Sequence, residues 1–317
     1  MDIQIRPVRP GDVFGITRTV LAARGFHGPE LDRQVEIDLQ RFRDQNITDL
    51  IESETLIAHV GTRIVGVMRY GEFEGDVHLT HPDIDPAFDE ELVTEAFLQK
   101  FWGLVESETG KAVYLDYPNH QRKTLGDVFL RNGFYKLIDR VDMNLRLTAD
   151  VKPQTKSLLY SSYSKKTHDR FFEAFRTSFS GTLDPMMEWD AKHPEQSFEM
   201  FRERFGVFDP NLWVLATDST GRDVGFALFQ NFHGGRYGGT TMLLYMAVLP
   251  DSRGHGYGEE ILREGLRRVR KSNGANATVA LTVTRGNTPA ERIYERLGFQ
   301  SVEQFTVYNM KRQYPFF

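Results

Sequence analysis

The feature that most constrains this 317-residue chain is a strand-like segment that ends in a glycine-rich loop. Residues 242–249 are largely apolar and indicate a buried strand, which Pro250 ends. Three glycines follow at alternate positions, and from Ile261 onward apolar residues recur at helical spacing. A strand, a loop and a helix in this order leave unpaired backbone N–H groups at a helix N-terminus, which favours an anion. The segment therefore predicts a phosphate or diphosphate site.

The residues of the loop support that prediction without proving it. Glycine lets a backbone approach a ligand closely, and Arg253 adds a positive charge. The spacing differs from the dinucleotide-binding fingerprint, which requires G-x-G-x-x-G and an acidic residue about 20 positions later. Alternate glycines also occur in ordinary turns, so the loop alone leaves a purely structural role open.

A second pattern begins at Asn287, after the strand-like residues 278–284. Asn287 or Thr288 can cap a helix that has Pro289 in its first turn, and Gly298 can end it. The residues that share one face of this helix are Ala290, Ile293, Tyr294 and Leu297. Such a face predicts packing against a core, with the tyrosine half-buried.

The two patterns together resemble the acyl-CoA-binding core of the GNAT N-acetyltransferase superfamily. In that family a V-x-P-x-x-R-G-x-G-x-G/A loop binds the pyrophosphate of coenzyme A, and a later N-x-x-A-x-x-x-Y-x-x-x-G-F segment lies along its thiol arm. The matching residues here are Val248, Pro250, Arg253, Gly254, Gly256 and Gly258, then Asn287, Ala290, Tyr294, Gly298 and Phe299. The resemblance implies acetyl-CoA as co-substrate, contacted by Met246, Ala247, Val248, Arg253, Gly254, His255, Gly256, Tyr257, Gly258, Asn287, Ala290 and Tyr294.

The order of predicted elements occurs twice along the chain. In the second copy, helices at 170–179 and 195–205 precede strands at 212–217 and 224–230, the two motifs and a strand at 300–311. In the first copy the elements are a strand at 3–7, helices to about residue 52, strands at 55–60, 64–70 and 76–80, a helix at 90–109, a strand at 112–116 and a helix at 125–134. We therefore predict an α/β (α+β) fold of two tandem GNAT domains, 1–150 and 151–317, each a mixed, mostly antiparallel sheet flanked by helices. This arrangement resembles the tandem acetyltransferases of the mycothiol synthase type.

The first copy departs from the motif at the positions that bind the cofactor. Residues 81–91 contain neither glycine nor arginine, and their five acidic side chains would repel a pyrophosphate. The region that corresponds to Tyr294 contains Asp127, Val128 and Phe129 instead. We predict that residues 1–150 form a degenerate domain and that only residues 151–317 bind acyl-CoA.

Charge differs between the two copies in the same sense. Residues 1–150 carry 26 acidic and 17 basic side chains (net −9), and residues 151–317 carry 18 and 22 (net +4). A basic half suits an anionic cofactor, and an acidic half suits a cationic acceptor. A simple difference in surface charge explains the same numbers equally well.

The remaining composition excludes several classes of protein. The absence of cysteine excludes disulfides, thiolate metal sites and a cysteine nucleophile, and agrees with a cytoplasmic location. No run approaches the ~20 apolar residues that span a bilayer, and the nine histidines show no metal-binding spacing. An acidic chain without basic–aromatic clusters argues against nucleic acid. We therefore expect a small-molecule partner, no metal, no membrane and no nucleic acid, with monomer and homodimer both open.

The family resemblance implies direct attack of an amine on the acetyl thioester. Tyr294 lies where the family usually has its general acid, although it could merely orient the thiol arm. A backbone N–H near residues 246–248 is the expected donor to the oxyanion. The identity of the general base is left open by the sequence. Residues 240–248 contain no carboxylate, and Tyr245 is the only residue among them with an ionisable ring. The other candidates are His233, Asp184, Glu188 and Asp190, of which Glu188 is our guess.

Three functions fit these features. The first is an N-acetyltransferase that moves an acetyl group from acetyl-CoA to a primary amine of a small molecule. The second is an acyltransferase that acts on an amine of a protein or peptide. The third is a sensor that binds acyl-CoA without turnover. The absence of a carboxylate from residues 240–248 argues slightly for a sensor, whereas the complete motifs argue against one.

Overall fold

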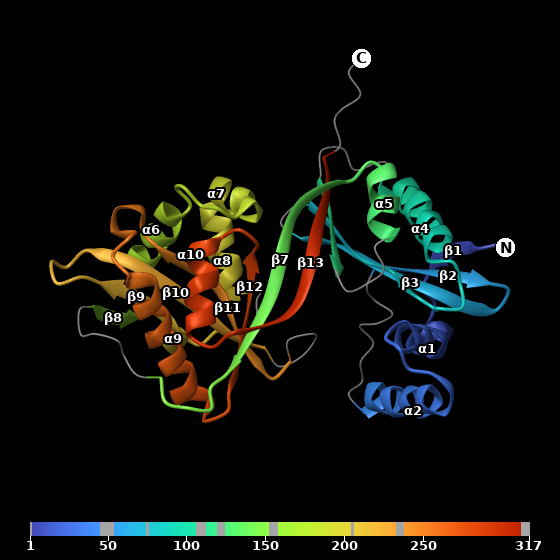
Figure 1. Cartoon of the computed structure of the whole chain (residues 1–317), viewed down its shortest axis with the longest axis horizontal. Coiled ribbons are helices and arrows are strands. Elements are labelled where there is room, and N and C mark those ends of the chain that lie inside the picture. The colour runs from blue at the N-terminus through green and yellow to red at the C-terminus, as the bar shows by residue number, and fades with distance from the viewer. Residues whose placement is uncertain are drawn as a thin grey trace, which may run out of the picture. The chain divides into compact units, whose positions relative to one another are not determined.

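The computed structural model describes residues 2–44, 54–73, 76–105, 112–118, 124–151, 158–203, 206–232 and 238–311. Internal contacts divide the chain into unit 1, Met1–Asp139 with Phe305–Phe317, and unit 2, Arg140–Gln304. The chain enters unit 2 within β7 (Tyr135–Arg146) and returns to unit 1 within β13 (Gln300–Lys311), which are the long green and red strands of Figure 1.

Unit 1 is a sheet with helices on both faces. Its other elements are β1 (Gln4–Pro7), α1 (Val13–Ala23), α2 (Gly28–Asp44), β2 (Thr55–Val60), β3 (Arg63–Phe73), β4 (Asp76–Thr80), β5 (Asp83–Ile84), α4 (Glu90–Val105), β6 (Ala112–Pro118) and α5 (Thr124–Arg131). The main strand order is β1-β2-β3-β4-β6-β13, in which only β4 and β6 are parallel. Alternation along β2 places Leu56 in the core under α4 and α5, and Ile57 in the cluster with Ile16 of α1.

Unit 2 repeats this plan. Its elements after β7 are β8 (Leu159–Ser162), α6 (His168–Ser178), α7 (Glu188–Lys192), α8 (Pro194–Glu203), β9 (Trp213–Thr217), β10 (Asp223–Phe232), β11 (Thr240–Val248), α9 (Tyr257–Asn273), β12 (Thr278–Thr284) and α10 (Thr288–Arg296). The strand order is β7-β12-β11-β10-β9-β8, in which only β11 and β12 are parallel.

Two apolar cores cover the two faces of the unit 2 sheet. Val214 and Phe229 pack with α9 and α10 on one face, while Trp213 and Phe226 pack with α6 and α8 on the other. The close contact with α9 requires Gly265, because a Cβ there would lie 2.2 Å from the Phe229 ring. The predicted mixed, mostly antiparallel α/β fold is therefore confirmed, and the strands predicted at 212–217, 224–230, 242–249 and 278–284 are β9 to β12.

The boundary between the units differs from the division expected at residue 150. Residues 140–146 pair with β12 and belong to unit 2, whereas residues 305–311 pair with β6 and belong to unit 1. The strand that follows the last helix of each copy thus completes the sheet of the other copy. Composition marks where a strand ends, but it does not tell which sheet the strand joins. Residues 45–53, 106–109 and 152–157, to which some predicted helices and the junction extended, lie outside the described residues.

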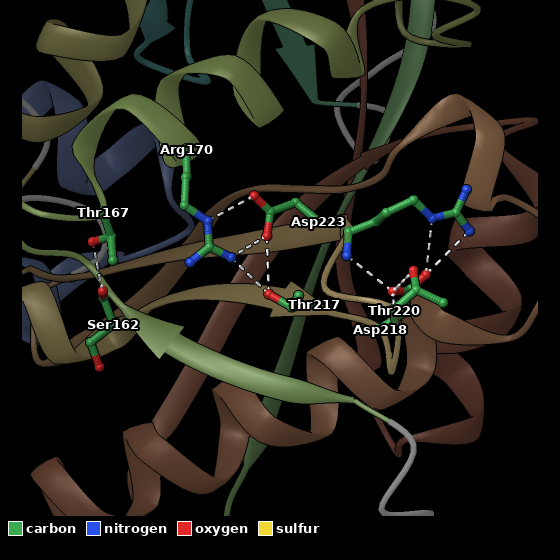
Figure 2. A network of polar contacts seen from close by, with 8 residues as sticks. Ser162, Thr167, Arg170, Thr217, Asp218, Thr220 and Asp223 are labelled. Carbon is green, nitrogen blue, oxygen red and sulfur yellow. Dashed lines mark hydrogen bonds and ion pairs between the residues drawn. The ribbon is translucent and has the colours of Figure 1, made fainter.

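Helix α6 is fixed to the sheet at the turn between β9 and β10 by a polar network (Figure 2). Arg170 donates from Nε to Asp223 (3.0 Å) and from Nη2 to Thr217 Oγ1 (2.9 Å), and it also pairs with the second Asp223 oxygen. In the adjoining turn, Asp218 accepts hydrogen bonds from Thr220 and Arg222, which hold its pKa at about 2. Arg170 lies near the start of α6, so the network sets the direction in which the helix approaches the site described next.

Candidate functional site

The site begins where β11 and β12 separate. These parallel strands pair only at Thr241 with Val279 and Met242 with Ala280. Beyond that point β11 continues along β10 as far as Val248, and β12 continues along β7 as far as Thr284. The register with β10 also shifts between Leu228 and Phe229, which marks a bulge in β11. A wedge-shaped gap therefore opens between two strands that remain anchored on their outer sides.

The hydrogen-bond register identifies the β11 backbone groups that face this gap. The N–H of Leu249 donates to the carbonyl of Val224 (2.9 Å), which fixes the phase of the antiparallel ladder. Because backbone groups alternate between the two sides of a strand, Ala247 faces β10 while Met246 and Val248 face the gap. The backbone N–H groups of Met246 and Val248 therefore point into the gap. Both belong to residues 246–248, the range in which a donor to the oxyanion was predicted.

The glycine-rich loop continues from the end of β11. A short 3-10 helix, Pro250–Ser252, leads into Gly254 (φ +82°) and Gly256 (φ +79°), and α9 begins at Tyr257. Both glycines have open space where a Cβ would lie, so their positive φ is what requires glycine. Gly256 is the N-cap of α9, and no side chain caps this end. The first N–H groups of a helix have no partner within the helix, so this terminus is available to an anion.

Arg253 makes structural contacts in addition to the cofactor contact that the motif predicts. Its guanidinium donates to the carbonyls of Val248 (Nε, 3.2 Å), Gly181 (Nη1, 3.3 Å) and Ser178 (Nη2, 3.2 Å). The side chain therefore joins the loop to the end of α6 as well as lining the pocket. His255 also contacts its own loop, because Nδ1 lies 3.0 Å from the Arg253 carbonyl and the ring stacks on Tyr257.

Helix α10 forms the opposite wall. Asn287 is its N-cap, without a side-chain cap bond, and Asn287, Ala290 and Tyr294 all line the pocket. Tyr294 is 8% exposed and packs edge-on against Phe299 at 5.7 Å between ring centroids. Burial raises the pKa of the Tyr294 phenol well above its usual value, and the negative charge of Asp184 raises it further. The phenol therefore keeps its proton at neutral pH.

A third wall comes from the face of the sheet that α6 covers. Asp184 lines the pocket, and its carboxylate lies 3.6 Å from Nη2 of Arg140 on β7. Tyr245 lies under Phe175 and Phe179 and shares a 3.1 Å hydrogen bond with Ser178, and burial raises its pKa to about 12. Its phenol is therefore a poor base at neutral pH.

The structure changes the choice among the predicted bases. Glu188 lies on α7 with 58% of its side chain exposed, pairs with Lys192 at 2.7 Å, and is absent from the pocket lining. Asp190 is 2% exposed, lies outside that lining and accepts a hydrogen bond from Ser197. His233 lies outside the described residues. Among these acidic candidates, Asp184 lines the pocket and Glu188 does not.

These walls enclose one pocket of about 1000 Å³ within unit 2. All twelve residues predicted to contact the cofactor line it. Sequence reasoning missed Arg140, Ser178 and Thr284, which also line it. Arg140 and Ser178 lie on elements remote in sequence from the two motifs, and Thr284 ends the strand just before the second motif without being part of it. The described residues bring together no cluster of His, Cys, Asp or Glu suited to a metal ion. Among the same residues, no helix is both long and apolar enough for a membrane span.

In the equivalent region of unit 1 the two parallel strands stay paired further along. Strand β4 pairs with β6 from Val77 to Thr80, so no gap opens between them. The short strand β5 occupies the place of the glycine loop, and Asp89 Oδ1 accepts from the N–H groups of Glu91 and Leu92 at the start of α4. A carboxylate thus occupies the helix terminus that is uncapped in unit 2.

Comparison with known proteins agrees with this geometry. The sequence model of the acetyltransferase (GNAT) family matches residues 169–299. Mycothiol acetyltransferase of Saccharomonospora viridis is 35% identical over 120 residues, which cover 35% of this chain and 39% of that protein. Mycothiol acetyltransferase of an Arthrobacter species is 32% identical over 127 residues, 38% of each chain. The chain therefore matches less than half the length of these relatives.

Solved structures extend the likeness in fold to nearly the whole chain. A GCN5-related N-acetyltransferase from Sphaerobacter thermophilus matches with a TM-score of 0.65 at 18% identity, covering 98% of this chain and 95% of that one. A tandem GNAT protein from the clavulanic acid biosynthesis pathway matches with a TM-score of 0.60 at 12% identity, covering 98% of both. Residues 169–299 thus match the GNAT acetyltransferase family, and the fold of nearly the whole chain is similar to that of a tandem GNAT protein.

The three carbonyl contacts of Arg253 predict that its loss weakens the protein even without ligand. We expect Arg253→Ala to lower the free energy of unfolding by about 1–2 kcal/mol, a discounted sum for partly exposed hydrogen bonds. Urea denaturation of the ligand-free protein measures this effect. Arg267→Ala, on the exposed face of α9, is the matched control and should change stability by less than about 0.5 kcal/mol. Unchanged stability in Arg253→Ala would contradict the structural role.

Proposed function

We propose that unit 2 binds acetyl-CoA in this pocket and transfers its acetyl group directly to a primary amine of a small molecule. The observation that carries the proposal is the continuity between two features. The open edge of β11 leads without interruption into the uncapped N-terminus of α9. An extended, amide-bearing arm suits the first feature, and a diphosphate suits the second.

The residues present fit coenzyme A. The N–H groups of the Gly254–Gly258 loop and the first turn of α9 would hold the diphosphate. Glu259 in that turn would oppose an anion, but Arg263 and Arg296 both bond its carboxylate. Burial acts to raise the pKa of Glu259, but the bonds to the two arginines outweigh burial and lower this pKa. The Glu259 carboxylate is therefore ionised, and the two guanidinium groups offset its negative charge. When bound, the coenzyme supplies an acyl thioester.

Two walls of the pocket carry the groups suited to proton transfer, Tyr294 on α10 and Asp184 after α6. The buried Tyr294 phenol, which keeps its proton, is suited to protonate a departing thiolate. The N–H groups of Met246 and Val248 are suited to stabilise negative charge that develops on the acyl oxygen. Asp184, across the pocket, is suited to hold an acceptor ammonium and to accept its proton. The likeness to mycothiol acetyltransferases supports a small-molecule acceptor.

Replacing a loop glycine should impair cofactor binding through backbone strain. Gly256 (φ +79°) and Gly221 (φ +87°), in the β9–β10 turn, both have open space at the Cβ position, so alanine strains each similarly. We expect Gly256→Ala to weaken coenzyme A binding by at least about tenfold, a change of about 1.4 kcal/mol. Gly221→Ala should leave the affinity unchanged.

Calorimetry should also show one coenzyme A per chain, and two equivalent sites would contradict the assignment of unit 1 as degenerate.

Removing the Tyr294 hydroxyl should impair turnover more than binding. We expect Tyr294→Phe to lower kcat by about 100-fold, as for the loss of a general acid, with little change in coenzyme A affinity. Thiol release from acetyl-CoA measures the first effect, and calorimetry measures the second. Burial raises the pKa of Tyr294, so the phenol should keep its proton up to about pH 10. Deprotonation of Tyr294 should therefore not lower kcat of the parent enzyme below that pH. Unchanged kcat in Tyr294→Phe would remove the residue from the acid role.

The two carboxylates considered as bases give a matched pair of substitutions. We expect Asp184→Asn to lower kcat/KM for the amine by about 100-fold or more, because an acceptor base is lost from the pocket. Glu188→Gln should have little effect, since Glu188 is exposed and pairs with Lys192. Both variants are assayed by thiol release at saturating acetyl-CoA. A larger loss in Glu188→Gln than in Asp184→Asn would restore Glu188 as the base.

A further inference from the structure

Arg140 reaches the pocket with unused hydrogen-bonding capacity. Its side chain is 19% exposed, and its Nη2 lies 3.6 Å from Asp184, too far for a hydrogen bond. Its Nε is buried and makes no hydrogen bond with any described residue. An orphan N–H of this kind on a cation is costly unless a ligand or water fills the position.

Thr284 lies directly beside it with the same property. Arg140 and Thr284 are opposite each other in the β7–β12 ladder, so their side chains are neighbours on one face of the sheet. Thr284 is 2% exposed, lines the pocket, and its Oγ1 has no hydrogen-bond partner among the described residues. The structure thus places two buried, unsatisfied donors next to each other at the pocket wall.

The pair lies on the acceptor side of the sheet. Val141 and Val283, one position along each strand, pack in the core with α10 and Tyr294. Alternation therefore directs Arg140 and Thr284 to the opposite face, where Asp184 approaches. The next carboxylate on that face, Asp142, accepts a hydrogen bond from Thr282 (2.6 Å).

We propose that Arg140 and Thr284 bind a carboxylate of the acceptor, so that the acceptor is an amino acid or another compound with an amine and a carboxylate. Two adjacent donors, one of them charged, match the two oxygens of a carboxylate. The ammonium of the same molecule then faces Asp184, whose charge is felt at Tyr294. This inference rests on the proposed transfer and specifies its substrate class.

The experiment uses the full chain and acceptors in matched sets: L-amino acids, their carboxamides and the corresponding decarboxylated amines. Thiol release gives kcat/KM for each, and calorimetry on the coenzyme A-loaded protein gives acceptor affinity without turnover. We expect carboxylate acceptors to be preferred by about 10- to 100-fold, as for a charge-assisted hydrogen bond. Arg140→Gln should remove that preference through KM, and Thr284→Val should reduce it by about three- to tenfold. The acetyl-CoA KM should not change.

The other end of the same strand pair provides the control. Arg146 lies opposite Thr278, is exposed and does not line the pocket, so Arg146→Gln and Thr278→Val should leave the preference intact. Equal losses for carboxylate and neutral acceptors in Arg140→Gln, or no loss for either, would overturn the inference while leaving acetyl transfer in place. Arg140-dependent binding of carboxylate acceptors without thiol release would instead overturn the transfer and support the carboxylate site.

Discussion

The pocket exists because two parallel strands stop pairing after two residue pairs. Beyond Met242 and Ala280, β11 follows β10 and β12 follows β7, so each strand stays paired on its outer side. The inner sides are left as an open edge, which in most sheets is a liability. Here the open edge is the inner wall of the pocket, so the same constraint that weakens the sheet creates its binding surface.

The two units show how little is needed to close such a site. In unit 1, β4 stays paired with β6 to its last residue, and Asp89 caps the helix that follows. In unit 2, Gly256 leaves the corresponding helix uncapped and the strands part. The fold is shared, but one carboxylate and two additional strand pairs decide whether a helix terminus can accept an anion.

Arg253 and Arg170 together explain why α6 is held firmly against this opening. Near the start of the helix Arg170 bonds Asp223 at the beginning of β10, and at its end Arg253 bonds the Ser178 carbonyl. The pocket wall that contains Ser178 and Asp184 is therefore linked to the glycine-rich loop before α9. A substitution in this loop affects both halves of the pocket.

The sequence by itself determined the parts of the site that are local. Strand, glycine loop and helix follow one another within residues 240–273, and Asn287, Ala290 and Tyr294 share one helix face, so spacing was sufficient to predict them. Tertiary structure alone decided what arrives from elsewhere. Arg140 precedes Tyr294 by more than a hundred residues and lies in the range 1–150 that was expected to form the other domain. Asp184 rather than Glu188 lines the pocket because of how the chain turns after α6. Short-range periodicity records which residues share a face, but pairing between distant strands depends on the whole sheet, and no local pattern encodes it.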